Sequence, residues 1–158
     1  MKTRQKKPFA DFFDVISIGE GEEALLELCE LYETMKREGR YQRSAFLREA
    51  SHIPGFYVPS LYDVKYNDDN TIAEFIPVRE GVPSKVRKRI IKDLDSVYYP
   101  ENFVVPFTDI VHNRVSVEVL RGCIRGCRFC QAGFIYRPFR EKSTSNICKQ
   151  SKALCENT

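Results

Sequence analysis

The stretch RVSVEVLRGCIRGCRFC, residues 114–130, says more about fold and chemistry than any other part of this chain. Its first seven residues alternate, with a valine at every second position, which predicts a β-strand over Arg114–Leu120. Three cysteines follow directly, Cys123, Cys127 and Cys130, in a C-x-x-x-C-x-x-C pattern. Three thiolates this close along a chain are able to ligate three irons of a [4Fe–4S] cluster and to leave the fourth iron without a protein ligand.

The residues around these cysteines suit a metal-binding loop. Gly122 and Gly126 are expected to let the backbone turn tightly around a bulky cluster, with amides that reach its sulfurs. Phe129 is expected to shield the cluster or to stack on a planar ligand. Active sites of α/β folds lie at the carboxyl ends of parallel strands, which is the place that this loop would take after its strand.

Zinc and thiol–disulfide chemistry are the competing interpretations. A structural zinc site needs four protein ligands, and the fourth would have to come from His112 or Cys148. Zinc motifs usually come as two separated pairs, whereas three cysteines are grouped here. A redox pair formed by Cys127 and Cys130 is disfavoured by the third cysteine beside it. The alternative from another class is a non-catalytic module that binds zinc or nucleic acid.

The composition restricts the class of protein and the cellular compartment in which this loop is expected. At 158 residues, with 42% hydrophobic and 30% charged residues, the chain fits one ordinary globular domain. It has no apolar run near the roughly 18 residues of a membrane helix, and no hydrophobic signal-peptide core follows its basic start. A cytoplasmic location without a membrane partner is therefore expected. In that reducing compartment six cysteines favour metal binding or catalysis over disulfides.

Positive charge is concentrated around the cysteines, although the net charge of the chain is only +3. Between Arg114 and Lys142 there are seven basic and two acidic residues, a local charge of +5. Such a belt favours the thiolate form that binds metal. It would also attract an anionic substrate or partner, including nucleic acid or an RNA-linked substrate, or it is simply a solvated basic surface.

The N-terminal part reads as a strand, a turn and a helix. Asp14–Ile18 is predicted to be a short buried strand, and a Gly-Glu-Gly-Glu turn leads into a helix that ends near Glu38, with Gly39 as its cap. Together these elements make half of a βαβ unit. The predicted apolar stripe of the helix consists of Leu25, Leu28, Cys29, Tyr32 and Met35. Cys29 is accordingly expected in the core.

Further elements are predicted along the rest of the chain. Ser44–Ser51 is expected to be helical, Leu61–Tyr66 and Thr71–Val78 to form a β-hairpin, and Pro83–Leu94 to be either helix or strand. A last helix is expected to begin at Ser143, a good N-cap residue. Its periodicity places Cys148 and Cys155 on the buried face, hence in the core.

Three stretches carry a resemblance to a known family. Residues 117–134, continued by 136–140 and Ser143, resemble the cluster loop of radical S-adenosylmethionine (SAM) enzymes. Residues 14–22 are similar to the closing strand, loop and helix of a cobalamin-binding-like domain. Residues 53–59, with Val111 and His112, look like the linker of the subgroup that joins these two parts, a group of Fe–S oxidoreductase type.

The resemblance implies cofactors and roles. Cys123, Cys127 and Cys130 would hold a [4Fe–4S] cluster, the free iron would bind SAM, and the aromatic residue before the third cysteine, Phe129, would lie near the adenine. A reductant such as flavodoxin or ferredoxin would be a partner, and the substrate is not indicated. Gly19 and Gly21 would border a cobalamin, which the resemblance allows.

The fold class expected on this basis is α/β. Residues 1–40 would be the last βα unit of a cobalamin-binding-like, Rossmann-like domain, and 41–113 an α+β linker with the β-hairpin. Residues 114–158 would begin a radical SAM (β/α) barrel, which takes about 250 residues when whole. The chain is therefore expected to be a central fragment that does not turn over SAM alone.

Overall fold

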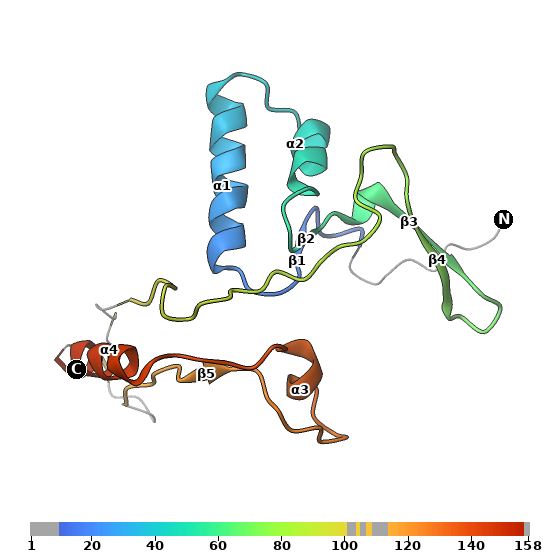
Figure 1. The fold of residues 1–158 in the computed structure, drawn as a ribbon. Coiled ribbons are helices and arrows are strands. Elements are labelled where there is room, and N and C mark those ends of the chain that lie inside the picture. The colour runs from blue at the N-terminus through green and yellow to red at the C-terminus, as the bar shows by residue number, and fades with distance from the viewer. Residues whose placement is uncertain (1–9, 101–103, 105–106, 109–113, 157–158) are drawn as a thin grey trace. The chain divides into compact units, whose positions relative to one another are not determined.

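The computed structural model describes residues 10–100, 104, 107–108 and 114–156 (Figure 1). The chain divides into two compact units, one up to Ile90 and one from Ile91 on, which we call unit 1 and unit 2. The boundary differs from the three segments expected at 40 and 113. Secondary structure is mixed α and β, and each of the three two-stranded sheets found in the described ranges is antiparallel.

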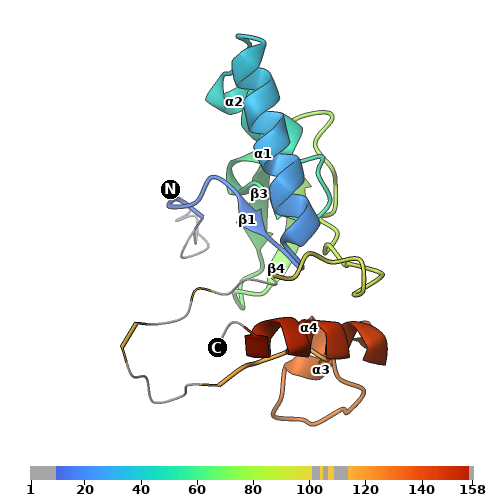
Figure 2. The same ribbon diagram turned by 90° about the vertical axis from the view of Figure 1, so that its left-hand side faces the viewer.

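Two helices dominate unit 1 and lie side by side (Figures 1 and 2). They are α1, Glu22–Arg37, and α2, Arg43–Ala50, and both match the predicted helices. Gly39 ends α1 with a positive φ of 69° and donates its amide to the carbonyl of Lys36, so the predicted cap is confirmed. Acidic residues begin α1 and basic residues end it, as the helix dipole favours.

The predicted apolar face of α1 is wrong in part. Met35 is buried and Leu28 half-buried, but Leu25, Cys29 and Tyr32 are exposed, so Cys29 is not a core residue. The buried line runs through Ala24 instead. The predicted stripe and the buried stripe have the same helical spacing. Periodicity alone therefore does not tell which stripe of α1 packs against the rest of unit 1.

The first strand is shorter and more open than predicted. β1, Ile16–Ser17, pairs with β2, Phe56–Tyr57, and the pair is antiparallel, not the parallel pair of a βαβ unit. The chain leaves β1 along α1 and comes back along α2, so β2 runs against β1. Ser17 is exposed and Ile16 only half-buried, which corrects the prediction of a buried strand.

The predicted hairpin is confirmed. β3, Tyr62–Tyr66, follows the short 3₁₀ helix η1, Pro59–Leu61, and pairs with β4, Ile72–Pro77. The Tyr62 ring stacks on Phe75 across the two strands, with centroids 4.5 Å apart. The buried residues of this core cluster are Leu47, Tyr57, Val58, Leu61, Tyr62 and Val82. Residues 83–94 are neither helix nor strand, apart from a single bridge at Arg89.

Unit 2 contains one short sheet and two helices. β5, Leu120–Arg121, pairs with β6, Arg140–Glu141, and between them lie the cysteine loop and α3, Ala132–Ile135. The chain ends its described part with α4, Thr144–Glu156. None of the helices in the described ranges is long and apolar enough to cross a membrane.

The predicted strand Arg114–Leu120 is confirmed only at its last residue. Residues 114–119 form no ladder, and Val119 is exposed although Val117 is half-buried. A parallel partner requires a crossover of a dozen or more residues, and the strand found beside β5 is antiparallel. The described part of unit 2 therefore does not show the first βα unit of a barrel.

The last helix begins as predicted but buries another face. The Ser143 hydroxyl accepts a hydrogen bond from the Asn146 amide at 3.2 Å, which confirms it as the N-cap. Gln150 and Leu154 are buried. Cys148 and Cys155 are exposed, so placing them in the core was wrong.

Candidate metal centre

The cysteine loop is closed at its base by the β5–β6 ladder. Arg121 pairs with Arg140 and Leu120 with Glu141, and the Lys142 amide donates to the carbonyl of Val119 at 3.0 Å. The chain between the two strands holds all three candidate cysteines. The loop therefore starts and ends at one fixed place although its own residues form no strand.

Gly122 is required by the backbone at the start of this loop. Its φ is +93°, a value that side chains rarely adopt, and an added Cβ would lie 2.7 Å from the carbonyl oxygen of Tyr136. The same Cβ would lie 2.9 Å from the Cα of Phe139 and from the carbonyl oxygen of Pro138. The predicted tight turn is thus present at Gly122.

The second glycine has a different environment. A Cβ added to Gly126 would meet no atom within 4 Å, and its φ is not positive. Nothing in the described structure therefore requires glycine at this position, and the space beside it is open. Gly133 in α3 was not singled out from the sequence, yet a Cβ there would lie only 2.5 Å from the carbonyl oxygen of Arg125. This contact packs α3 directly against the cysteine loop.

The three cysteines carry free thiols on one accessible loop. Cys127 is exposed, and Cys123 and Cys130 are half-buried. The Arg125 amide donates to the sulfur of Cys123 at 3.4 Å. Such amide–sulfur hydrogen bonds also occur around iron–sulfur clusters. Three thiols reachable from solvent suit iron, so the donor set fits the expected cluster.

The thiols are not yet gathered around one point. In the part of the chain that the structure describes, no three His, Cys, Asp or Glu side chains lie close enough together to hold a metal ion. His112 lies outside the described residues. The loop therefore supplies three free thiols and a base that is fixed by the β5–β6 ladder.

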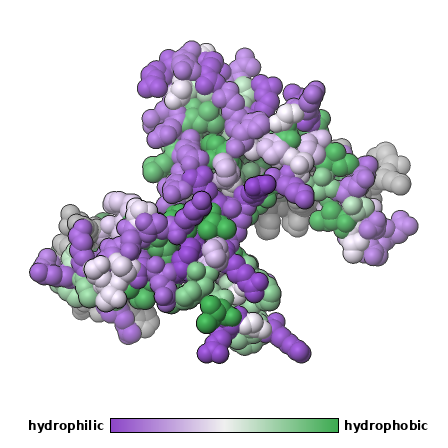
Figure 3. All heavy atoms as spheres, viewed as in Figure 1, coloured by the Kyte–Doolittle hydropathy of each residue, from purple (hydrophilic) through white to green (hydrophobic). Residues whose placement is uncertain are grey.

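Aromatic and basic side chains surround the loop. Phe129 is 92% exposed, which leaves its ring free to cover a ligand. The Arg137 guanidinium lies 5.0 Å from the centroid of the Phe134 ring, and Arg128 is exposed. Hydrophobic and hydrophilic residues are intermixed on the visible face around α3 (Figure 3).

A partly buried ionic network lies beneath the loop, and the sequence did not reveal it. Glu118 accepts two hydrogen bonds from Arg121, Nε to Oε1 at 2.6 Å and Nη2 to Oε2 at 3.0 Å. The hydrogen bonds from Arg121, and then the positive charges of Arg121 and Lys142, hold the pKa of Glu118 below its usual range against partial desolvation. The Lys142 ammonium is 3.6 Å from Glu118 and 4.6 Å from the centroid of the Tyr99 ring. The alternation over residues 114–120 does not tell on which side of the chain the Glu118 side chain lies.

The glycines expected to border a cobalamin lie in unit 1. Gly19 has a φ of +110°, and a Cβ there would lie 2.2 Å from the carbonyl oxygen of Arg89. Gly19 is therefore needed for close packing against Arg89, whose guanidinium binds Glu23 and Glu27 of α1. Gly21 has no atom within 4 Å of an added Cβ. Neither environment indicates a cobalamin.

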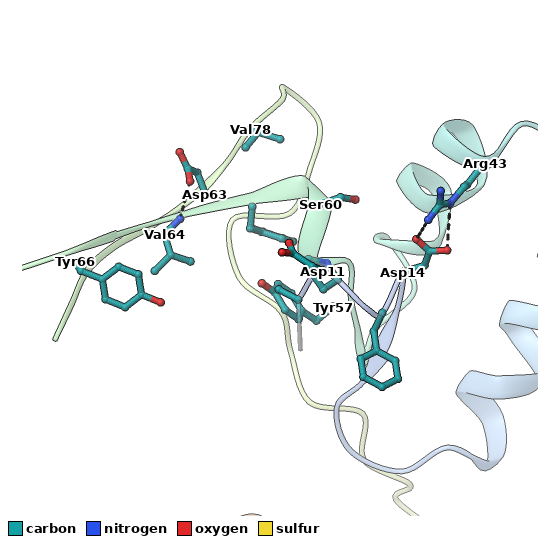
Figure 4. Close-up of a pocket in the computed structure, with 13 residues that line it drawn as sticks. Asp11, Asp14, Arg43, Tyr57, Ser60, Asp63, Val64, Tyr66 and Val78 are labelled. Carbon is teal, nitrogen blue, oxygen red and sulfur yellow. Dashed lines mark hydrogen bonds and ion pairs between the residues drawn. The ribbon is translucent and has the colours of Figure 1, made fainter. Parts of the chain in front are cut away.

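A separate pocket lies in unit 1, between the chain before β1 and the start of the hairpin (Figure 4). Its volume is about 390 Å³, and it was not predicted from the sequence. Tyr57 and Tyr66 line it together with Asp63, while Asp14 at its rim binds Arg43 through two hydrogen bonds. No metal-binding group of carboxylates is formed among its described residues.

A family model matches the N-terminal part of the chain. Residues 2–59 match the family model described as radical SAM proteins, N-terminal. No curated protein and no solved structure matches the chain. The matched segment includes α1, α2 and β2 but not the cysteine loop, so it is independent of the cysteine pattern. It supports the radical SAM family and extends past the boundary expected at residue 40.

Proposed function

We propose that this chain is a radical SAM protein in which Cys123, Cys127 and Cys130 ligate a [4Fe–4S] cluster that binds SAM. The observation that carries the proposal is the set of three free thiols on one accessible loop with a fixed base. The family match supports it from a separate segment, residues 2–59. Substrate and reaction product are not assigned.

Cys123, Cys127 and Cys130 would hold the cluster, which would supply the electron for cleavage of the sulfonium bond of SAM. The chain supplies the rest of the site. Gly122 turns the backbone so that the thiols share one loop, and Phe129 offers an exposed ring to the adenine. Exposed arginines such as Arg125 and Arg128 make the surroundings positive, which favours the approach of an acidic reductant such as flavodoxin or ferredoxin.

The proposal is limited to binding for this chain by itself. Unit 2 shows one antiparallel pair of strands in its described residues and no parallel strands that would surround SAM. We therefore expect the chain to bind a cluster and not to turn over SAM alone. Gly19 is packed against Arg89, so cobalamin is left out of the proposal.

Anaerobic reconstitution with iron and sulfide tests the assignment of ligands. The wild-type chain should take up about four irons and show the broad visible absorption of a [4Fe–4S] cluster. Serine at Cys123, Cys127 or Cys130 should abolish this uptake, whereas a C148S/C155S double variant serves as the matched control and should retain it. Equal iron uptake by all these variants, or a colourless chain that binds zinc, would reject the proposal.

A further inference from the structure

Glu118 ties together the two ends of the cysteine loop. Arg121 belongs to β5, directly before the loop, and Lys142 directly follows β6, after the loop. Both side chains reach the same carboxylate, Arg121 through two hydrogen bonds and Lys142 as an ion pair at 3.6 Å. The link is thus made by side chains, in addition to the backbone ladder of β5 and β6.

Burial makes the loss of one partner of this link more costly than at an ordinary surface ion pair. The side chain of Lys142 is 1% exposed, that of Arg121 17% and that of Glu118 34%. Gln150 of α4 accepts a further hydrogen bond from the Lys142 ammonium at 3.2 Å. Loss of the carboxylate would leave a buried ammonium without its counter-charge, which is costly.

We infer that Glu118 is a positioning residue, which fixes the ends of the cysteine loop through Arg121 and Lys142 before any metal binds. Arg121 lies two residues before Cys123, so the orientation of its backbone sets where the first thiol emerges. The inference rests on the proposed function for what the loop holds, but not for the effect of Glu118 on the metal-free loop. Groups that support metal ligands in this way typically change metal affinity by about 10–100-fold when they are removed.

The metal-free chain provides the first test, by the rate at which iodoacetamide alkylates each thiol. In the wild-type chain Cys123, which is half-buried, should react more slowly than Cys127, which is exposed. Glu118→Gln should raise the rate at Cys123 by about tenfold, the scale of a hydrogen bond to a charged group, and leave Cys127 unchanged. Glu141→Gln is the matched control, because Glu141 is an exposed glutamate on β6.

The cluster-loaded chain provides the second test, by the rate at which a chelator removes iron. Glu118→Gln should accelerate the loss about 10–100-fold over the wild-type and Glu141→Gln chains. It should also broaden the electron paramagnetic resonance (EPR) signal of the reduced cluster, because the first ligand is less well fixed. Arg121→Lys keeps the charge but loses the two-pronged hydrogen bond. It should shift both readouts in the same direction, and it serves as the second variant if Glu118→Gln does not fold.

The outcomes separate this inference from the proposed function. A wild-type chain that takes up no cluster refutes the function, and alkylation of Cys123 still decides the role of Glu118. Equal alkylation rates and equal iron loss in Glu118→Gln, Arg121→Lys and Glu141→Gln would overturn the inference even if the cluster forms. Circular dichroism of each variant checks that the total helix content is retained, so that a general loss of structure is not mistaken for a loosened loop.

Discussion

Replacing Gly122 by alanine should loosen the cysteine loop, whereas the same change at Gly126 should not. Gly122 has a φ of +93°, and its added Cβ would meet three backbone atoms at 2.7–2.9 Å, none of which is the end of a flexible side chain. A side chain held in such a region costs about 1–3 kcal/mol, before any shift of the neighbouring backbone. Gly126 has neither a positive φ nor an atom within 4 Å, so alanine fits there.

Hydrogen exchange of the Lys142 amide measures how much Gly122→Ala destabilises the base of the cysteine loop. That amide donates to the carbonyl of Val119 beside the β5–β6 ladder, so it exchanges when the base of the loop opens. A loss of about 1–3 kcal/mol corresponds to exchange that is about 5–150-fold faster in Gly122→Ala. The Gly126→Ala chain should exchange like the wild type. Equal exchange in the two variants, or faster exchange in Gly126→Ala alone, would contradict a backbone requirement for glycine at position 122.

Two further predictions concern the core of unit 1 and the start of α4. Met35→Ala should lower the free energy of unfolding of unit 1 by about 2–5 kcal/mol, because Met35 is 1% exposed. Leu25→Ala, at an exposed position of the same helix, should change this free energy little. Urea denaturation followed by hydrogen exchange distinguishes the two variants. Hydrogen bonds from the Asn146 side chain and the amide of residue 143 hold the pKa of Asp95 below its usual range. A lowered pKa stabilises the start of α4 above about pH 3.9, and this contribution is lost as the pH falls through the lower folded-state value. Exchange protection there should therefore fall below about pH 4 in the wild type, and an unchanged pH profile in Asp95→Asn relative to the wild type would contradict the assignment.

Elements with strong end signals were predictable from the sequence. α1 begins among glutamates and ends at Gly39, and α4 begins after Ser143, because capping depends on residues that are neighbours in the chain. The hairpin of β3 and β4 was likewise visible, since its turn and its alternation are local. In each case the interactions that decide the element lie within a few residues of one another.

Long-range partners were not predictable in the same way. Alternating valines suggested a strand at 114–120, but a strand also needs a neighbour, and only Leu120 and Arg121 find one. The exposed positions of Cys29, Cys148 and Cys155 show the same limit for helices, because periodicity defines a face without saying what covers it.

The candidate site also contains some features that depend on neighbouring residues and others that depend on distant segments. The spacing of the three cysteines and the glycine at Gly122 are local, and the structure places them on one loop with a tight turn. Gly133 and the link from Glu118 to Lys142 depend on approaches between segments distant in the chain, so they appear only in the structure. Alternation alone could not tell which way Glu118 points.

The most direct test of the account is the EPR spectrum of the reduced, reconstituted chain with and without SAM. We expect the signal of a [4Fe–4S] cluster that depends on Cys123, Cys127 and Cys130, and a change of that signal when SAM binds the open iron. The C148S/C155S chain should behave in the same way. A chain without a cluster signal, or a cluster signal that SAM leaves unchanged, would contradict the central claim that this loop builds a SAM-binding iron–sulfur centre.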